Sequence, residues 1–387
     1  MKKNIYITAL HLLHGGVEMA IASLANALAK RDYNVTLLCT YNLGSPAYYI
    51  DPKVNIEYLT DVKPNREAFK NAIRQKNIFA AVKEGFYALK VLRLKKKVLI
   101  NSFKNISDGV IISTRNEDSV LLSKYGNNNV LKIAQLHHDH CFDKKLINDF
   151  KNHYGNIDIF TLLTETLTAE VTEIMKKNLH TKCITLPNFL PENDIFEEKE
   201  VVLENQAVAV GRLHPVKGFL RLIEIWGEIS KKSDTKLKII GGGEQREELS
   251  ALIKKLDLED KVILTGALDH NQVLEEMQKS IFYTMTSTSE GFGFVLIEAM
   301  SQGTPAIAFD VRVGPRAIID DKINGFLIKD GEKEAFVQKA LFLINNPEER
   351  EKLSRAAKLK SHDFSEDKLL EKWENLFNSK ESPNEIH

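Results

Sequence analysis

The sequence predicts an α/β protein with two domains, each a doubly wound parallel sheet covered by helices. Short runs rich in β-branched residues alternate with helical patterns along the whole chain, as parallel strands joined by helical crossovers require. The alternation runs through two successive series, and 387 residues are enough for two hydrophobic cores. Pro187 and Pro191 interrupt the pattern between the two series. The boundary between the domains is therefore expected near residue 188.

The first series predicts a Rossmann-like domain over residues 1–188. Its strands are expected at residues 5–9, 35–39, 110–113, 130–134, 157–163 and 183–186. Helical patterns or long connections fill the gaps. After Gly15 and Gly16, for example, apolar residues follow a helical spacing at Val17, Ile21 and Leu24.

The second series predicts a second Rossmann-like domain over residues 189–362. Its strands are expected at residues 207–210, 237–240, 262–264, 281–285, 306–309 and 326–328. No long linker separates the two series, so we expect the domains to face each other across a cleft. In such sheets ligands bind beyond the carboxyl ends of the strands, so functional residues should lie in loops just after strands.

The last segment, residues 363–387, predicts a helix that crosses back to the first domain, followed by a disordered tail. Ser365 is a suitable N-cap, and Leu369, Leu370, Trp373 and Phe377 follow with helical spacing. A plain surface helix is the alternative. Residues 380–387 have the composition of a disordered terminus.

Composition indicates a cytoplasmic protein without a membrane span. The chain has three cysteines and no CxxC pair, which argues against a disulfide framework and a cysteine zinc site. No apolar run is long enough for a transmembrane helix. The N-terminal apolar stretch is too short for a secretory signal and predicts a first strand.

The net charge of zero conceals an uneven distribution. Residues 1–188 contain 26 Lys and Arg against 17 Asp and Glu, whereas residues 189–387 contain 27 against 36. Most of the excess lies in residues 66–104, where eleven basic residues accompany only Glu67 and Glu84. Aromatic and aliphatic residues are interleaved with these charges, which favours an anionic surface over a nucleic-acid groove. We expect no nucleic-acid partner.

Within this basic segment, apolar residues follow a helical spacing of four, four, three and three. They are Ile78, Val82, Phe86, Leu89 and Leu92. Lys83, Lys90, Arg93 and the run Lys95–Lys97 flank or follow the stripe. Basic residues near an anionic leaflet hold a protein reversibly on a membrane. The sequence thus predicts a peripheral position on the inner face of the plasma membrane. The alternative is that the stripe packs into the core.

Three loops predicted to follow strands carry residues suited to anions. Gly15 and Gly16 stand at a strand-to-helix turn, where exposed N–H groups attract a phosphate or a polar sugar. Arg212 and Lys217 follow a strand of the second domain, and together they suit a diphosphate. Surface salt bridges are the alternative for these two residues. A third close-approach loop contains Gly241–Gly243.

Two glutamates, Glu290 and Glu298, stand eight residues apart around a Gly-x-Gly turn that opens a helix. A glycosidase would need both carboxylates to flank one bond. The intervening helix start is of the kind that binds phosphate and argues against that arrangement. We interpret the two glutamates as clamps on two parts of an extended ligand.

The segment Gln135–Cys141 contains three histidines, an aspartate and a cysteine. These ligands are too crowded for a tetrahedral zinc site from one segment, and His11 or His14 would have to join them. We therefore expect no metal. His138 and His140 either reach the acceptor or lie on the surface.

From about residue 4 to residue 375 the chain resembles the bacterial retaining glycosyltransferases of family 4, which have the GT-B fold. The matching pieces occur in the family's order: Gly15–Glu18, Gly211–Leu213 with Lys217–Gly218, Gly241–Glu244, and Glu290–Glu298. The segment Phe309–Pro315 is similar to a subset that acts on cell-surface polymers and glycoproteins. His137 matches a family histidine beside the transferred sugar, although Leu136 replaces the usual glutamate.

The resemblance implies a role for each matching residue. Arg212 and Lys217 would bind the donor diphosphate, Glu298 the ribose, Glu290 the sugar near its 3-hydroxyl, and His137 the sugar during catalysis. The other residues implied in donor binding come from glycine-rich turns and a helix start: Gly16, Gly242, Gly243, Gly291, Phe292, Gly293, Phe294 and Val295.

The sequence and the resemblance together predict a retaining, metal-independent enzyme that needs no cofactor. It would transfer a hexose or N-acetylhexosamine from a nucleotide sugar, UDP-linked, to an envelope polysaccharide, lipid-linked or polymer acceptor. Fixed positive groups would stabilise the leaving diphosphate, and that phosphate would take the acceptor's proton on the front face of the sugar. The alternatives are a sugar-nucleotide epimerase or phosphorylase of the same fold, a catalytically silent partner that binds an acceptor protein, and a dehydrogenase.

Overall fold

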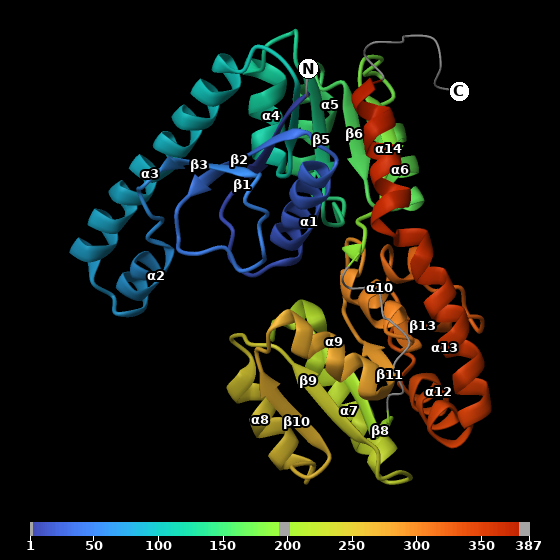
Figure 1. Ribbon diagram of the computed structural model, residues 1–387. Coiled ribbons are helices and arrows are strands. Elements are labelled where there is room, and N and C mark those ends of the chain that lie inside the picture. The colour runs from blue at the N-terminus through green and yellow to red at the C-terminus, as the bar shows by residue number, and fades with distance from the viewer. Residues whose placement is uncertain (1–2, 193–201, 379–387) are drawn as a thin grey trace. The chain divides into compact units, whose positions relative to one another are not determined.

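The computed structural model describes residues 3–192 and 202–378, which form two compact units (Figure 1). Among these residues, unit 1 comprises 3–162, 168–186 and 370–378, and unit 2 comprises 163–167, 187–192 and 202–369. Each unit is a parallel sheet with helices alternating along the chain. The predicted fold class is therefore confirmed. Which substrate each unit binds stays a prediction.

Unit 1 contains a seven-stranded parallel sheet in the order β3-β2-β1-β4-β5-β6-β7. The inner strands are almost completely buried because helices cover both faces, as the uninterrupted apolar runs require. The strands are β1 (Asn4–Ala9), β2 (Asn34–Tyr41), β3 (Asn55–Thr60), β4 (Val110–Ser113), β5 (Leu131–Leu136), β6 (Ile159–Leu162) and β7 (Lys182–Thr185).

One helix follows each of β1, β4, β5 and β6, and two helices stand in the long connection between β3 and β4. The connection between β2 and β3 contains none. Helices α6 and α14 each begin in residues assigned to unit 2 and end in unit 1. The helices are α1 (Gly16–Lys30), α2 (Arg66–Arg74), α3 (Ile78–Asn105), α4 (Asn116–Tyr125), α5 (Lys144–His153), α6 (Glu165–Ile174) and α14 (Glu366–Asn378).

The strand order of unit 1 reverses between β1 and β4, which are neighbours in the sheet. Their carboxyl ends are joined by Thr8 and Thr114: the Thr114 N–H donates to Thr8 Oγ1 at 3.1 Å, and Thr114 Oγ1 donates to the Thr8 carbonyl at 2.8 Å. The loops after β1 and β4 therefore start side by side, at the position where sheets of this kind bind ligands.

Unit 2 contains a six-stranded parallel sheet in the order β10-β9-β8-β11-β12-β13. Its order reverses between β8 and β11, so the loops that follow these two strands are neighbours. The strands are β8 (Glu204–Val210), β9 (Lys236–Ile240), β10 (Val262–Gly266), β11 (Ser280–Met285), β12 (Ala306–Asp310) and β13 (Gly325–Lys329).

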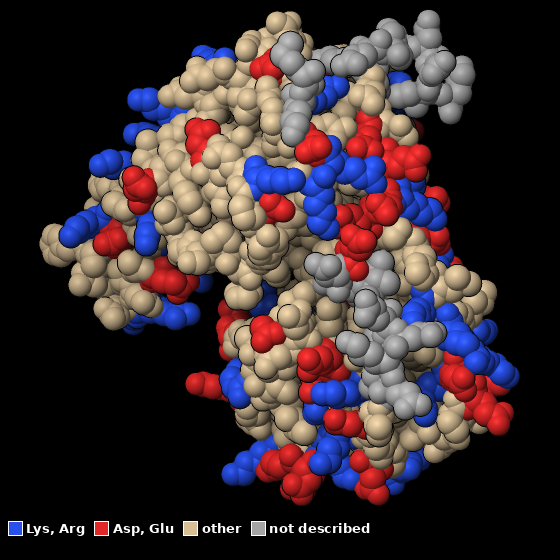
Figure 2. Space-filling model, in the orientation of Figure 1, with Lys and Arg blue, Asp and Glu red and all other residues tan. Residues whose placement is uncertain are grey.

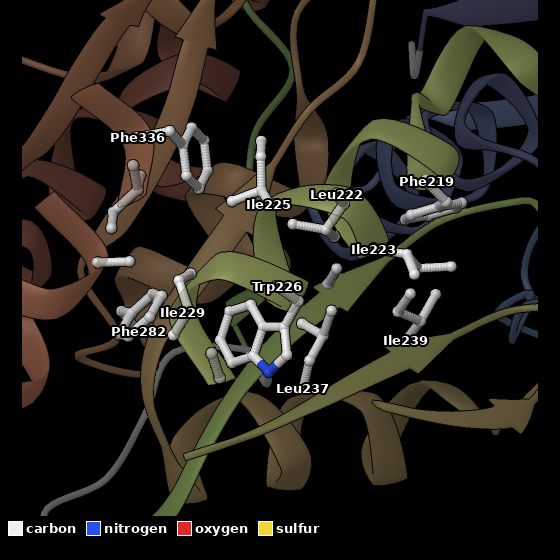
Figure 3. Close-up of a cluster of buried hydrophobic side chains, with 14 of the residues drawn as sticks. Phe219, Leu222, Ile223, Ile225, Trp226, Ile229, Leu237, Ile239, Phe282 and Phe336 are labelled. Atoms are coloured by element: carbon white, nitrogen blue, oxygen red, sulfur yellow. The ribbon is translucent and has the colours of Figure 1, made fainter. Parts of the chain in front are cut away.

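Helices cover both faces of this sheet. They are the short η2 (Pro215–Lys217), then α7 (Phe219–Ser230), α8 (Arg246–Lys255), α9 (His270–Lys279), α10 (Phe294–Ser301), α11 (Pro315–Ile318), α12 (Lys333–Asn345), α13 (Pro347–Ser361) and η3 (His362–Phe364). One face is centred on Trp226 of α7, which packs among Leu222, Leu237 and Phe282 (Figure 3). Residues of β8 and β11 belong to this core, so it fixes the two strands whose following loops form the candidate functional site.

Strand β3 was not predicted from the sequence. It lies at the edge of the sheet beyond β2, and its residues are only half-buried or exposed. Asn55, Glu57 and Tyr58 interrupt the apolar run there, so the pattern that marks buried strands is missing.

The C-terminal helix α14 packs on unit 1. Tyr33 and Phe377 make an edge-to-face contact with ring centroids 5.7 Å apart, and Lys3 Nζ donates to the Phe377 carbonyl at 2.6 Å. Arg31 and Glu374 form an ion pair of 3.3 Å. The predicted tail, residues 380–387, lies outside the described residues.

Candidate functional site

The loops after β8 and β11 are joined by one main-chain and one side-chain hydrogen bond. The Thr288 N–H donates to the Val216 carbonyl at 2.7 Å, and Thr286 Oγ1 donates to the Gly218 carbonyl at 3.1 Å. Gly218 makes this approach possible, because a Cβ there would lie 2.0 Å from the Thr286 carbonyl oxygen and its φ is +67°. The short helix that ends at Lys217 is thereby fixed against the end of β11.

This junction brings Lys217 and Glu290 together. Lys217 Nζ lies 2.6 Å from Glu290 Oε1, and Ser287 Oγ donates to the same oxygen at 2.5 Å. The Glu290 side chain is only 9% exposed, and that of Lys217 is 23% exposed. Glu290 Oε2 makes no hydrogen bond with any residue in the described ranges. One carboxylate oxygen is thus held by two donors, while the other can accept a bond from a ligand hydroxyl.

Arg212 lies at the start of the same loop, directly after Gly211. Its side chain is exposed, and it forms no ion pair or side-chain hydrogen bond with the residues that the structure describes. The structure therefore does not join Arg212 to Lys217 or to a surface carboxylate. Its five N–H donors are available to an anion.

The glycine-rich turn after β9 lies against the Arg212 loop. The Leu213 N–H donates to the Gly242 carbonyl at 2.9 Å, and the Gln245 N–H donates to the Leu213 carbonyl at 3.1 Å. A Cβ on Gly243 would lie 2.4 Å from the Leu213 carbonyl oxygen. Gly242 has open space beside its α-carbon, so a ligand can approach it from that side, whereas Gly243 can face a ligand only with the rest of its main chain.

Helix α10 begins at Phe294 after Gly293, whose φ of +97° favours glycine. The N–H groups of Gly293, Phe294 and Val295 therefore stand at a helix N-terminus, where the helix itself offers them no acceptor. Phe292 is buried, with its ring 5.6 Å from that of Phe364. Its side chain belongs to the core, and only its main chain can face a ligand.

Glu298 is buried on the second turn of α10 and is 3% exposed. His270 Nδ1, from the first turn of α9, lies 3.8 Å from Glu298 Oε1. His270 was not identified from the sequence, because it stands 28 residues before Glu298 in a segment without a motif.

Arg221 was also missed, although it holds the loop that carries Ser287 and Glu290. Its Nε and Nη2 donate to the carbonyls of Thr286 and Ser287, and Nη1 lies 2.7 Å from Asp330 Oδ1. The guanidinium also stacks 4.4 Å above the Phe309 ring. An arginine on an amphipathic helix predicts a solvated charge, so no sequence pattern indicates this contact.

In unit 1, the turn at Gly15 and Gly16 already contains a carboxylate. Glu18 is 5% exposed, and its Oε1 lies 3.2 Å from Arg115 Nη2 and 3.7 Å from His11 Nδ1. A Cβ on Gly15 would lie 2.1 Å from Glu18 Oε2, whereas Gly16 has open space beside it. A phosphate at this turn would be repelled by Glu18, so the turn is better suited to sugar hydroxyls.

His137 directly follows β5. Both ring nitrogens are buried, and neither has a hydrogen-bond partner among the described residues. Burial above all, with the charges of His138 and Arg115, lowers the pKa of His137 to about 3. The ring is therefore neutral at physiological pH and offers one donor and one acceptor.

The two other histidines of this segment differ from each other. His138 is exposed, whereas His140 is buried and bonded on both nitrogens: the Phe142 N–H donates to Nδ1 at 3.0 Å, and Nε2 lies 3.0 Å from Glu170 Oε2. His140 is thus a structural residue. Across residues 3–192 and 202–378, no three His, Cys, Asp or Glu side chains are grouped so that they could hold a metal ion.

Two parallel-sheet units of this kind define the GT-B class of folds. The solved structure of TarM covers 98% of this chain and 99% of its own, with a TM-score of 0.77 at 18% identity. The pneumococcal O-GlcNAc transferase GtfA, solved with UDP and GlcNAc, has the same TM-score, 0.77, at 16% identity, with coverage of 98% and 99%.

The sequence comparisons identify the family. The model for glycosyl transferases group 1 matches residues 192–360. The amylovoran biosynthesis glycosyltransferase AmsD of Erwinia amylovora is 30% identical over 379 residues, 94% of this chain and 96% of its own. A poly(ribitol-phosphate) α-N-acetylglucosaminyltransferase of Staphylococcus aureus is 28% identical over 329 residues, 83% of this chain and 62% of its own. The chain belongs to the group 1 glycosyltransferases, as the resemblance predicted.

Proposed function

We propose that this glycosyltransferase moves a hexose or N-acetylhexosamine from a UDP-linked donor to an acceptor of the bacterial envelope, with retention at the anomeric carbon. The observation that carries the proposal is the Lys217–Glu290 pair at the junction of β8 and β11. A cation and a carboxylate with one unused oxygen suit the two halves of a sugar diphosphate. The cation suits the phosphates, and the oxygen suits a sugar hydroxyl.

In the proposed reaction the bond between the anomeric carbon and the diphosphate oxygen breaks, and a bond to the acceptor oxygen forms on the same face. Negative charge develops on the diphosphate, where Lys217 and Arg212 stabilise it. The leaving phosphate takes the acceptor's proton, so the residues need not supply a base. Glu290 is neutralised by Lys217, which suits a residue that positions the sugar better than one that attacks it.

The remaining residues have binding roles in this proposal. Glu298 holds the ribose hydroxyls, and the main chain of Gly242, Gly243 and Gly291–Val295 faces the diphosphate or the sugar. The neutral ring of His137 contacts the transferred sugar, and the turn at Gly16 contacts its hydroxyls. Neither a metal ion nor a cofactor has a part in the proposal, because Lys217, Arg212 and the N-terminus of α10 neutralise the diphosphate.

The acceptor is proposed from what related proteins act on. The AmsD relative is named for amylovoran biosynthesis, and the Staphylococcus aureus relative for transfer to poly(ribitol-phosphate). Both names describe polymers of the bacterial envelope. We therefore propose an envelope polysaccharide, a lipid-linked sugar or a related polymer, and a place of action in the cytoplasm, at the inner face of the plasma membrane.

The test is a donor screen followed by stereochemical analysis of the product. Purified protein is incubated with UDP-glucose, UDP-galactose, UDP-GlcNAc and UDP-GalNAc, with and without membrane lipid extract or teichoic-acid polymer, and UDP release is measured. We expect one of the four donors to support UDP release and the acceptor to increase the rate of that release. NMR should show that the product is α-linked. A β-linked product would refute retention, and interconversion of donors without transfer would favour the epimerase.

A further inference from the structure

Helix α3 carries a row of apolar side chains that the structure leaves exposed. Phe79 is 91% exposed, Ile78 75% and Phe86 71%, and Val82, Leu89 and Leu92 are each more than half exposed. We call these six residues the α3 stripe. The alternative in which the stripe packs into the core is therefore wrong. The helix attaches to unit 1 through other residues, namely Val91, Leu99 and Phe103, which are buried.

The α3 stripe continues into a basic stripe on the same face of the helix. At about 100° per residue, Lys96 lies in line with Ile78, Lys97 with Phe79, and Arg93 within about 20° of Val82. All three basic residues are exposed. Figure 2 shows Lys and Arg side chains at intervals along the edge of unit 1 where α3 runs in Figure 1. The exposed face is thus mainly apolar over residues 78–92 and basic over residues 93–97, with the exposed Lys83 and Lys90 beside the apolar row.

The structure also corrects which lysines belong to this face. Lys95 points to the other side of the helix, where its Nζ lies 2.8 Å from Glu117 Oε2 of α4 and its side chain is 12% exposed. The acidic residues nearby do not oppose the basic stripe. Glu84 accepts a hydrogen bond from Asn65 at 2.6 Å, and Glu67 pairs with Lys70 at 3.4 Å.

We infer that this face of α3 docks the protein on an anionic lipid bilayer. The apolar first half enters the boundary between headgroups and acyl chains, and Arg93, Lys96 and Lys97 contact the anionic headgroups. An amphipathic helix with bulky apolar residues and lysines or arginines suits such an interface. No helix within residues 3–192 and 202–378 is long and apolar enough to cross a membrane, and this surface attachment requires none.

The inference specifies which surface would hold the protein at the location given in the proposed function. It rests on that function only for the purpose of the attachment, which is the supply of a lipid-linked acceptor. Binding itself needs no nucleotide sugar. Vesicle binding and sugar transfer are therefore measured separately, and the failure of one is distinguishable from the failure of the other.

The experiment is sedimentation of the full-length protein with vesicles of phosphatidylcholine, alone or with phosphatidylglycerol. One variant carries Phe79→Ser and Phe86→Ser, and another carries Arg93→Gln, Lys96→Gln and Lys97→Gln. The matched control carries Lys176→Gln, Lys231→Gln and Lys352→Gln, three exposed lysines that lie outside α3. Thermal melting confirms that each variant is folded.

We expect the wild type and the control to bind anionic vesicles at least ~10 times more tightly than either α3 variant, and neutral vesicles weakly. A Phe79→Trp variant should show a blue-shifted emission on anionic vesicles, since the native Trp226 and Trp373 are already buried. Binding that ignores the α3 substitutions would overturn the inference. The absence of vesicle binding would also overturn it. If the protein were then a dimer, and the Phe79 and Phe86 substitutions made it monomeric, a second copy of the chain would be what covers the α3 stripe.

Discussion

The ammonium group of Lys217 lies 2.6 Å from the Glu290 carboxylate, although the two residues are 73 positions apart in the sequence. The pair spans the ends of β8 and β11, where the strand order reverses. It places a positive and a negative group within reach of one ligand, and the first predictions concern its members and its neighbours.

We expect Lys217→Ala and Arg212→Ala each to lower kcat/KM by ~10²–10³-fold, equivalent to ~2–4 kcal/mol of transition-state stabilisation. The two variants should differ in stability. Arg212 has no ion pair to lose among the described residues, whereas removal of Lys217 leaves Glu290 with Ser287 as its donor. Steady-state kinetics and thermal melting measure both effects, with Lys231→Ala as the control. Near-normal turnover in either variant would refute its assignment to the diphosphate.

We expect Glu298→Gln to weaken donor binding and Glu290→Gln chiefly to lower turnover, by ~10²-fold. A ribose contact is the same in the ground state and the transition state, whereas a contact to the reacting sugar changes as the bond breaks. Donor Kd from calorimetry and kcat from UDP release separate the two effects. A covalent sugar adduct in Glu290→Gln, or rescue by azide, would require a double-displacement mechanism instead.

Activity should persist in excess EDTA, because Arg212, Lys217 and the N-terminus of α10 supply the positive charge near the diphosphate. The measurement is UDP release after EDTA treatment, with and without added Mg²⁺ or Mn²⁺. Activity that is lost in EDTA and restored by a divalent ion would contradict this expectation.

Arg221→Ala should destabilise the protein by ~1–3 kcal/mol, because the carbonyls of Thr286 and Ser287 lose their donors. It should also lower kcat, since that loop places Glu290. Asp330→Asn is the matched control, because it removes the negative charge beside Arg221 Nη1 and leaves both carbonyl contacts in place. Equal kinetic losses in the two variants would show that Arg221 does not position Glu290.

His137 should make the protein less stable as the pH falls from about 6.5 towards 3. Its pKa in the folded protein is about 3, below the unfolded value, so the unfolded state binds an extra proton in this window. The free energy of unfolding should therefore fall by up to ~1.4 kcal/mol per pH unit. Urea unfolding of wild type and His137→Gln between pH 7 and pH 4 measures the difference, and parallel curves would contradict it.

The sequence was sufficient for the architecture and for the loops of the candidate site. Buried parallel strands produce continuous β-branched runs, so most strands were predicted within a few residues. The edge strand β3 has no such run and was missed. Lys217 and Glu290 were identified because each lies in a short motif directly after a strand.

Contacts between distant segments could not be predicted in the same way. Arg221, His270 and the Glu18–Arg115 pair depend on which helix lies beside which loop, and this follows from packing rather than from local spacing. The direction of Lys95 is a similar case. Three consecutive lysines are equivalent in sequence, but the turn of the helix sends Lys95 to Glu117 and leaves its neighbours exposed.

Helix α14 has a consequence for how the chain acquires its structure. The residues that cover Tyr33 and bond to Lys3 are among the last of the described chain, yet they belong to the unit that contains the first strand. During synthesis, the surface of unit 1 around Tyr33 therefore stays uncovered until unit 2 has been translated in full. A fragment ending at residue 188 would remain permanently in that unfinished state.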